Sequence, residues 1–227
     1  MREPFGCADR RGDGVGVAIR DYLSWHEEYD RPGSPHYLRL LVVQDLIARA
    51  LEELPPGPLR LLSMCAGQGR DVLTVAARHR RGTDLVGRLV ELDPRNVEAA
   101  REAIASLGLH GLHVVQGDAG LSDAYQGATP AELVVACGIF GNVTDDDIER
   151  TVRFLPSLCA PGAWVIWTRY PRPQGILDSI GGWFSEAGFE PVALVAPEAP
   201  LFGVGAGRLV LDPQPFRPGL RLFQFVR

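Results

Sequence analysis

From Pro58 onward, the chain alternates between short apolar runs and longer segments whose apolar residues have helical spacing. The apolar runs predict strands at 59–64, 84–93, 113–118, 131–139 and 162–170. The segments between them predict helices at 70–81, 94–108 and 144–159. Strands joined by helices need right-handed crossovers, which lay the strands parallel and cover both faces of the sheet. The alternation therefore predicts an α/β fold built on one mostly parallel sheet.

The two ends of the chain depart from this alternation. Residues 1–17 are rich in Gly, Arg and Asp, and we expect them to be poorly ordered. Residues 18–56 hold two helical patterns separated by RPGSP, and we expect a helical lid there, ahead of a core at 57–227. After a last helix at 176–189 comes the strand EPVALVAP, and then GRLVLD or RLFQFVR closes the sheet without an intervening helix. This tail predicts an antiparallel hairpin at one edge.

Length and charge narrow the class of protein. The 227 residues suffice for one large α/β domain, and no second large domain is apparent. The formal net charge of −5 argues against nucleic acid as a partner, because phosphate binding needs a concentrated basic surface. The run RHRR, with Arg78, Arg80 and Arg81, is interpreted as a solvated helix end.

The cysteines bear on compartment and metal binding. Cys7, Cys65, Cys137 and Cys159 lie far apart with no C-x-x-C pair, a spacing that indicates neither a metal cluster nor a disulfide framework. The N-terminus shows no apolar leader, and no run approaches the roughly 18 apolar residues of a membrane span. We therefore expect a cytoplasmic protein with reduced thiols, no metal and no membrane segment.

The first predicted strand runs into small residues in RLLSMCAGQGRDV, which spans 60–72. A turn between a strand and a helix often carries glycine because glycine adopts positive φ freely. The alternative is that a ligand approaches the backbone there, where a side chain would collide with it. In open parallel sheets ligands bind at the carboxyl ends of the strands, where the start of a helix offers free N–H groups.

Acidic residues follow the next two strands. Glu91, with Asp93 as a second candidate, ends the second strand and can accept hydrogen bonds from both hydroxyls of a ribose. After the third strand, Asp118 can accept from the exocyclic amine of an adenine, and the N–H of Ala119 can donate to a ring nitrogen. Alternatively, Glu91 is a solvated strand end and Asp118 a helix cap. The sequence ACGIFGN after the fourth strand is small enough for a ligand to lie against it, or marks a turn.

Two common nucleotide motifs do not fit this loop. A dinucleotide fold uses G-x-G-x-x-G, whereas Val72 stands at the third glycine position and Arg70 crowds the turn. The chain also has no G-x-x-x-x-G-K-[ST] phosphate loop.

These residues resemble the motifs of class I S-adenosylmethionine-dependent methyltransferases. LLSMCAGQGRDV resembles their first motif, VELDPRNVEAAR the second, VVQGDA the third and ELVVACGIF the fourth. The resemblance covers roughly Leu59 to Arg227. It implies a Rossmann-like seven-stranded sheet of order 3-2-1-4-5-7-6 whose last strand is antiparallel, with helices on both faces. It also implies S-adenosylmethionine as cofactor and S-adenosylhomocysteine (SAH) as product.

The residues that the resemblance assigns to cofactor binding come from all four motifs. They are Ser63, Met64, Cys65, Ala66, Gly67, Gly69, Arg70, Glu91, Leu92, Asp118, Ala119, Cys137 and Gly138. Two of them depart from the family pattern, which usually has an acid at Ser63 and a glycine at Cys65. Ser63 would have to hold the ammonium of the methionine part through its hydroxyl or a water, and Arg70 or an N-terminal residue would hold the carboxylate. We interpret Cys65 as a small packing residue rather than a catalytic thiol.

The predicted lid carries the candidate catalytic residues. In WHEEYDRPGSPHY, Tyr29 and His36 could act as a base or an orienting pair, with Trp25 as a wall of the acceptor site. The structural alternative is that the aromatic rings pack the lid onto the core and the histidines are exposed.

Methyl transfer from a sulfonium is an in-line displacement that depends on proximity and orientation. We expect the acceptor to be an O or N atom of a small molecule or a peptide. The fourth motif has no N-P-P-[YF], which argues against methylation of DNA bases. Two rival functions are a non-catalytic nucleoside-binding protein of this fold, suggested by Ser63, and an NAD-dependent dehydrogenase, disfavoured by Val72.

Overall fold

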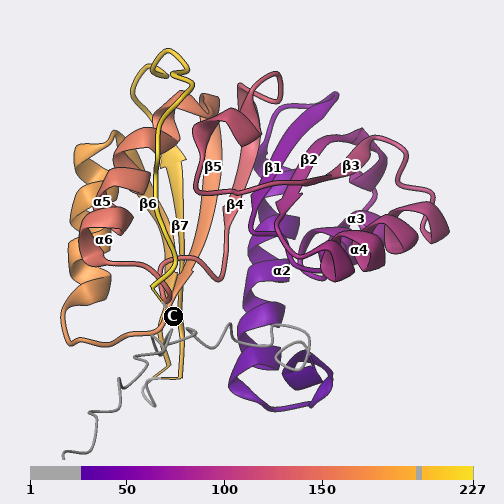
Figure 1. The fold of residues 1–227 in the computed structure, drawn as a ribbon, viewed down its shortest axis with the longest axis horizontal. Helices are drawn as coiled ribbons and strands as arrows, with labels where there is room; N and C mark the ends of the chain where they lie inside the picture. Colours follow the sequence, from indigo (N-terminus) through magenta and orange to yellow (C-terminus); the bar gives the residue numbers. More distant parts are fainter. Residues whose placement is uncertain (1–26, 198–200, 227) are drawn as a thin grey trace, which may run out of the picture.

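The computed structural model describes residues 27–197 and 201–226. They include one seven-stranded sheet of order β3-β2-β1-β4-β5-β7-β6 (Figure 1). The strands are β1 (Leu59–Met64), β2 (Leu85–Glu91), β3 (Leu112–Gln116), β4 (Ala131–Ala136), β5 (Cys159–Arg169), β6 (Phe189–Val195) and β7 (Gly203–Leu209). β7 pairs antiparallel with both β5 and β6, whereas the other pairs are parallel. The predicted sheet order and the antiparallel last strand are confirmed.

The helices begin at residues that favour helix starts. They are α2 (Pro35–Glu53), α3 (Val72–Arg78), α4 (Pro94–Ser106), α5 (Asp145–Phe154) and α6 (Ile176–Glu186), with short 3₁₀ turns η1 (Glu27–Asp30), η2 (Gly82–Asp84), η3 (Ser122–Tyr125) and η4 (Leu155–Ser157). The hydroxyl of Ser34 accepts a hydrogen bond from the N–H of Tyr37 at the start of α2. Thr144 caps α5 in the same way, ahead of three aspartates at the positive end of the helix dipole. None of the helices in the described part of the chain is both long and apolar enough to cross a membrane.

The core forms one layer on each face of the sheet. Neighbouring residues of β1 face opposite layers, so that Leu61 and Leu62, both fully buried, pack in different clusters. Leu61 shares its layer with residues of α2, α3 and α4, and Leu62 shares the other with residues of α5 and α6. This arrangement confirms helices on both faces.

The predicted lid falls partly on described residues. Residues 1–26, including the expected poorly ordered N-terminus and Trp25, lie outside them. α2 packs with Ile47, Ala50 and Leu51 fully buried against the sheet, so this helix contributes to the core. The lid itself stays a prediction for the residues ahead of α2.

The two candidates for the closing strand have different outcomes. β7 overlaps GRLVLD but begins earlier, at Gly203. The described part of RLFQFVR, residues 221–226, forms an isolated bridge between Arg221 and Leu121 and no named strand. Figure 1 shows this C-terminal chain, in yellow, running back along the sheet to the end labelled C.

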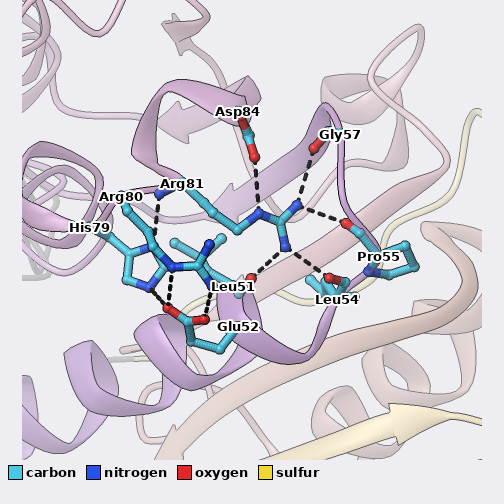
Figure 2. Close-up of polar contacts among 9 residues, drawn as sticks. All are labelled: Leu51, Glu52, Leu54, Pro55, Gly57, His79, Arg80, Arg81 and Asp84. Carbon is cyan, nitrogen blue, oxygen red and sulfur yellow. Dashed lines mark hydrogen bonds and ion pairs between the residues drawn. The ribbon is translucent and has the colours of Figure 1, made fainter.

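Arg81 corrects the interpretation of RHRR as a wholly solvated helix end. Its side chain is buried, and its guanidinium donates to the carbonyl oxygens of Leu51 (2.5 Å), Leu54 (2.8 Å), Pro55 (2.7 Å) and Gly57 (3.2 Å), as Figure 2 shows. A fifth contact, of 2.9 Å, reaches the Asp84 carboxylate. The last carbonyls of a helix lack partners within the helix, so Arg81 supplies the donors that the end of α2 needs. Arg78 and Arg80 are exposed, as expected.

Candidate functional site

A cavity of about 750 Å³ lies at the carboxyl ends of β1, β2, β3 and β4. The strand order reverses between β1 and β4, which is the place where open parallel sheets bind ligands. Its walls come from the loop after β1, the start of α4, the loops after β3 and β4, the region of Tyr29 and Leu40, and the C-terminal residues.

The loop after β1 has an unusual backbone. Cys65, Gly67 and Gly69 have φ values of 53°, 56° and 70°, in the left-handed region that glycine tolerates best. A Cβ on Gly69 would lie 2.9 Å from a carbon of Leu73 and 3.0 Å from one of Leu89. Gly69 is therefore required by its backbone and by the packing of α3 onto β2. Among the residues that the structure describes, Cys65 is the one non-glycine residue with a positive φ.

Glu91 connects this loop to the end of β2. One carboxylate oxygen accepts from the N–H of Gly67 at 2.7 Å, and the other accepts from the N–H of Asp93 at 2.8 Å. The side chain is almost buried but lines the cavity. Each carboxylate oxygen has two lone pairs, so each can accept one more hydrogen bond from a ligand hydroxyl.

Asp118 pairs with a residue that sequence analysis did not single out. One of its oxygens accepts from the N–H of Gly120 at 2.8 Å, and the other lies 2.6 Å from Nη1 of Arg221. The N–H of Leu222 donates to the carbonyl of Gly120, and that of Val226 to the carbonyl of Asn142, each at 2.8 Å. These bonds hold residues 219–226, the C-terminal segment, against the loops after β3 and β4.

Two phenylalanines of the C-terminal segment line the cavity. Phe223 is buried and stacks on Phe225 with 5.7 Å between ring centroids. The sequence signal that could have found them is the alternation in RLFQFVR, although alternation alone also fits a closing strand.

Tyr29 lines the cavity beside α2. Its hydroxyl oxygen accepts a 2.5 Å hydrogen bond from Arg39, and its ring meets that of His36 edge to face at 5.8 Å. Burial raises the pKa of Tyr29 to about 12, although Arg39 opposes this effect. The phenol is therefore protonated at neutral pH.

Burial also raises the pKa of three other groups at the cavity. Desolvation raises the pKa of the Cys65 thiol well above its ordinary value, and the carboxylates of Glu91 and Asp118 add to the effect. The pKa of Cys137 is raised by burial and by Asp71. Burial likewise raises the pKa of Asp71, whose carboxylate accepts from the N–H of Val72 at 2.8 Å. Both thiols are therefore protonated at neutral pH.

Most of the residues assigned from sequence line this cavity. They are Tyr29, Cys65, Ala66, Gly67, Arg70, Glu91, Leu92, Asp118, Ala119, Cys137 and Gly138. Four others lie outside its lining: His36, Ser63, Met64 and Gly69. Ser63 and Met64 are buried within β1, and Met64 packs in one of the two core clusters. The cavity residues that sequence analysis did not assign include Asp71, Asn96, Asn142 and the C-terminal segment.

Residues 37–180 match the model of a family described as "Putative methyltransferase". No functionally curated protein matches the chain in sequence.

Solved structures share the fold at low sequence identity. Magnesium protoporphyrin IX methyltransferase from Synechocystis PCC 6803, solved with bound SAH, is 12% identical with a TM-score of 0.63, over 83% of this chain and 93% of that one. A "putative O-methyltransferase" from Nostoc punctiforme is 19% identical with a TM-score of 0.56, over 74% of this chain. The chain spans 56% of the Nostoc protein's length. An O-methyltransferase family protein from Burkholderia thailandensis is 15% identical with a TM-score of 0.55, over 83% of this chain and 69% of that one.

Proposed function

The chain belongs to this methyltransferase family, and from that premise we propose that its cavity binds S-adenosylmethionine and directs its methyl group to an O or N atom of a small molecule or peptide. Bound S-adenosylmethionine supplies a methyl group activated by a sulfonium. The chain's own residues have to bind the donor, align the acceptor and exclude water. The observation that carries the proposal is the position of Glu91 at the carboxyl end of β2, inside the cavity.

The residues of the cavity fit an adenosine. Glu91 has spare lone pairs for two ribose hydroxyls while its backbone partners fix its orientation. Asp118 and Ala119 follow β3, next to β2 in the sheet, where an adenine attached to that ribose would extend. Gly138, after β4, has open space where a side chain would begin, so its backbone is accessible from the cavity.

The acceptor side is proposed to lie near Tyr29 and Leu40. This side is the region of α2, whereas Glu91 and Asp118 belong to the ends of β2 and β3. Because the pKa of Tyr29 is raised to about 12, its phenol suits donating a hydrogen bond to an acceptor better than removing a proton. His36 contacts the ring of Tyr29, and its proposed part is to orient that ring. Arg70, which pairs with Asp30 at 2.6 Å, stays a candidate for the donor's carboxylate.

Calorimetric titration with S-adenosylmethionine and with SAH tests the proposal. The same titration with NADH tests the rival function, a dehydrogenase. We expect both sulfur nucleosides to bind and Glu91→Gln to weaken each by about ten- to a hundredfold, because hydrogen bonds to a charged group contribute about 1.5–3 kcal/mol. Glu98→Gln, on the exposed side of α4, is the matched control and should bind like the wild type. Unchanged affinity in Glu91→Gln would remove the observation on which the proposal depends.

Transfer of a labelled methyl group separates an enzyme from a binding protein. The purified protein is incubated with methyl-labelled S-adenosylmethionine and a panel of phenols, amines and peptides. Label in one of these classes supports the proposed acceptor. Tight binding without transfer to any of them would favour the non-catalytic alternative.

A further inference from the structure

Four carboxylates line the cavity, and three of them are held by several donors. Glu91 accepts from two backbone N–H groups. Asp93 accepts from the N–H and the guanidinium of Arg95, and Asp118 from Gly120 and Arg221. The fourth, Asp71, accepts from the N–H of Val72, which follows it in the chain. The ion pairs seen among the described residues include Asp93 and Asp118 but not Asp71.

Asp71 precedes α3 on the side of the cavity where Gln44 of α2 donates to the carbonyl of Arg70 at 2.9 Å, whereas Glu91 and Asp118 lie at the ends of β2 and β3. The charges of Glu91 and Asp118 act on Cys65, whereas the charge of Asp71 acts on Tyr29 and on Cys137. Cys137 follows β4, on the opposite side of β1 from β2 and β3. A ligand whose adenosine lies at Glu91 and Asp118 therefore directs its other end toward Asp71.

That other end, in S-adenosylmethionine and in SAH, is an amino acid with an ammonium group. An ammonium has three N–H donors and a full positive charge, and a half-buried carboxylate is the partner it matches best. Ser63 lies outside the cavity lining, so its hydroxyl is not placed to take this group. We propose that Asp71 binds the ammonium of the methionine part, and this assignment rests on the proposed function.

Burial supports this assignment. The desolvated carboxylate of Asp71 has a raised pKa even with the positive charge of Arg39 nearby. A cation that enters the cavity offsets part of that desolvation and keeps the carboxylate ionised. The bound ammonium therefore adds to the positive charge of Arg39, which offsets the desolvation of Asp71 only in part.

The test compares SAH with 5′-methylthioadenosine, which keeps the adenosine and the sulfur but lacks the amino acid. We expect Asp71→Asn to weaken SAH about tenfold or more and to change the affinity for 5′-methylthioadenosine less than twofold. Asn caps a helix as well as Asp does, so the hydrogen bond to Val72 and the fold should persist. Asp45→Asn, on the exposed side of α2, is the matched control.

A thermodynamic cycle gives a second readout. An SAH analogue in which hydrogen replaces the α-ammonium should bind the wild type about tenfold more weakly than SAH does, and should bind Asp71→Asn as well as SAH does. If Asp71→Asn loses affinity for SAH and for 5′-methylthioadenosine equally, or loses affinity for neither, this inference is overturned and the proposed function still stands. A wild-type protein that binds neither SAH nor 5′-methylthioadenosine overturns the proposed function and this assignment with it.

Discussion

At the scale of single residues, Cys65 illustrates how the backbone of the loop limits the chemistry of its side chains. Its left-handed conformation, at φ 53°, is one that L-residues rarely adopt and that costs about 1–2 kcal/mol. The same loop buries the thiol beside two carboxylates. A reactive cysteine needs an electropositive surrounding that lowers its pKa, and Cys65 has the opposite.

We therefore predict slow alkylation of Cys65 in the native protein. Raising a thiol pKa lowers the thiolate fraction at every pH below that pKa, so the rate should keep rising with pH beyond 9. The measurement is iodoacetamide labelling of a Cys7→Ser variant between pH 7 and 10, with peptides resolved by mass spectrometry. Cys159, whose pKa is also raised by burial, is an internal control, and the unfolded protein gives the reference rate. A labelling rate for Cys65 that levels off near pH 7 would contradict the expectation.

Single residues also show what the sequence can and cannot predict. Glu91 could be predicted because an acid at the end of an apolar run stands out against its neighbours. The role of Asp71 could not be predicted, because it depends on which other carboxylates of the cavity already have partners. Arg81 reads as one more charge in RHRR, and four of its five acceptors lie 24 to 30 residues earlier in the chain.

At the scale of elements, the end of α2 depends on Arg81. Its guanidinium joins the last turn of α2 and the loop before β1 to the turn after α3 (Figure 2). Lysine has the same charge but cannot reach so many acceptors, because its three donors lie at one point. The contact therefore requires arginine.

We predict that Arg81→Met lowers the free energy of unfolding by about 3–5 kcal/mol, because it leaves buried carbonyls and Asp84 without their donor. Arg81→Lys should fall between this variant and the wild type. Urea denaturation followed by circular dichroism gives these values. Arg80→Met removes a neighbouring arginine that is exposed, and its midpoint should stay close to that of the wild type. Equal effects of the two methionine variants would show that the buried contacts matter little.

The elements themselves were predictable to within a few residues because apolar periodicity records which face of a helix or strand is buried. α4 begins at Pro94 as predicted, after the capping Asp93. β1 ends at Met64 as predicted, whereas the next four strands were predicted too long at their carboxyl ends. β4, for example, ends at Ala136, although the apolar pattern extends to Ile139. Ile139 is fully buried although the chain has already left the strand to form the cavity, and apolar composition does not distinguish these two states.

At the scale of the whole molecule, the cavity is closed by parts of the chain that are far apart in sequence. Tyr29 lies near one end of the described chain and Phe225 near the other, and both line the same cavity. Sequence analysis could predict the wall made by β1 to β4, because parallel strands bring their carboxyl ends to one edge. It could not predict the wall made by the C-terminal segment, because neither the hydrogen bonds of its backbone N–H groups nor the pair of Arg221 with Asp118 leaves a pattern in the sequence.

This closure predicts that a ligand should stabilise the C-terminal segment. If opening of residues 219–226 abolishes binding, ligand at 100 times its Kd favours the closed state by about 2.7 kcal/mol, a factor of about a hundred. Hydrogen exchange of the N–H groups of Leu222 and Val226, bonded to Gly120 and Asn142, should then slow by up to that factor when SAH binds. Mass spectrometry of the peptide that covers the segment measures the exchange rate. A peptide from α6, which lies outside the cavity lining, is the control, and its exchange by local opening should slow little. Slowing in the loop after β1 with none at Leu222 and Val226 would show that ligand binding does not depend on the C-terminal wall.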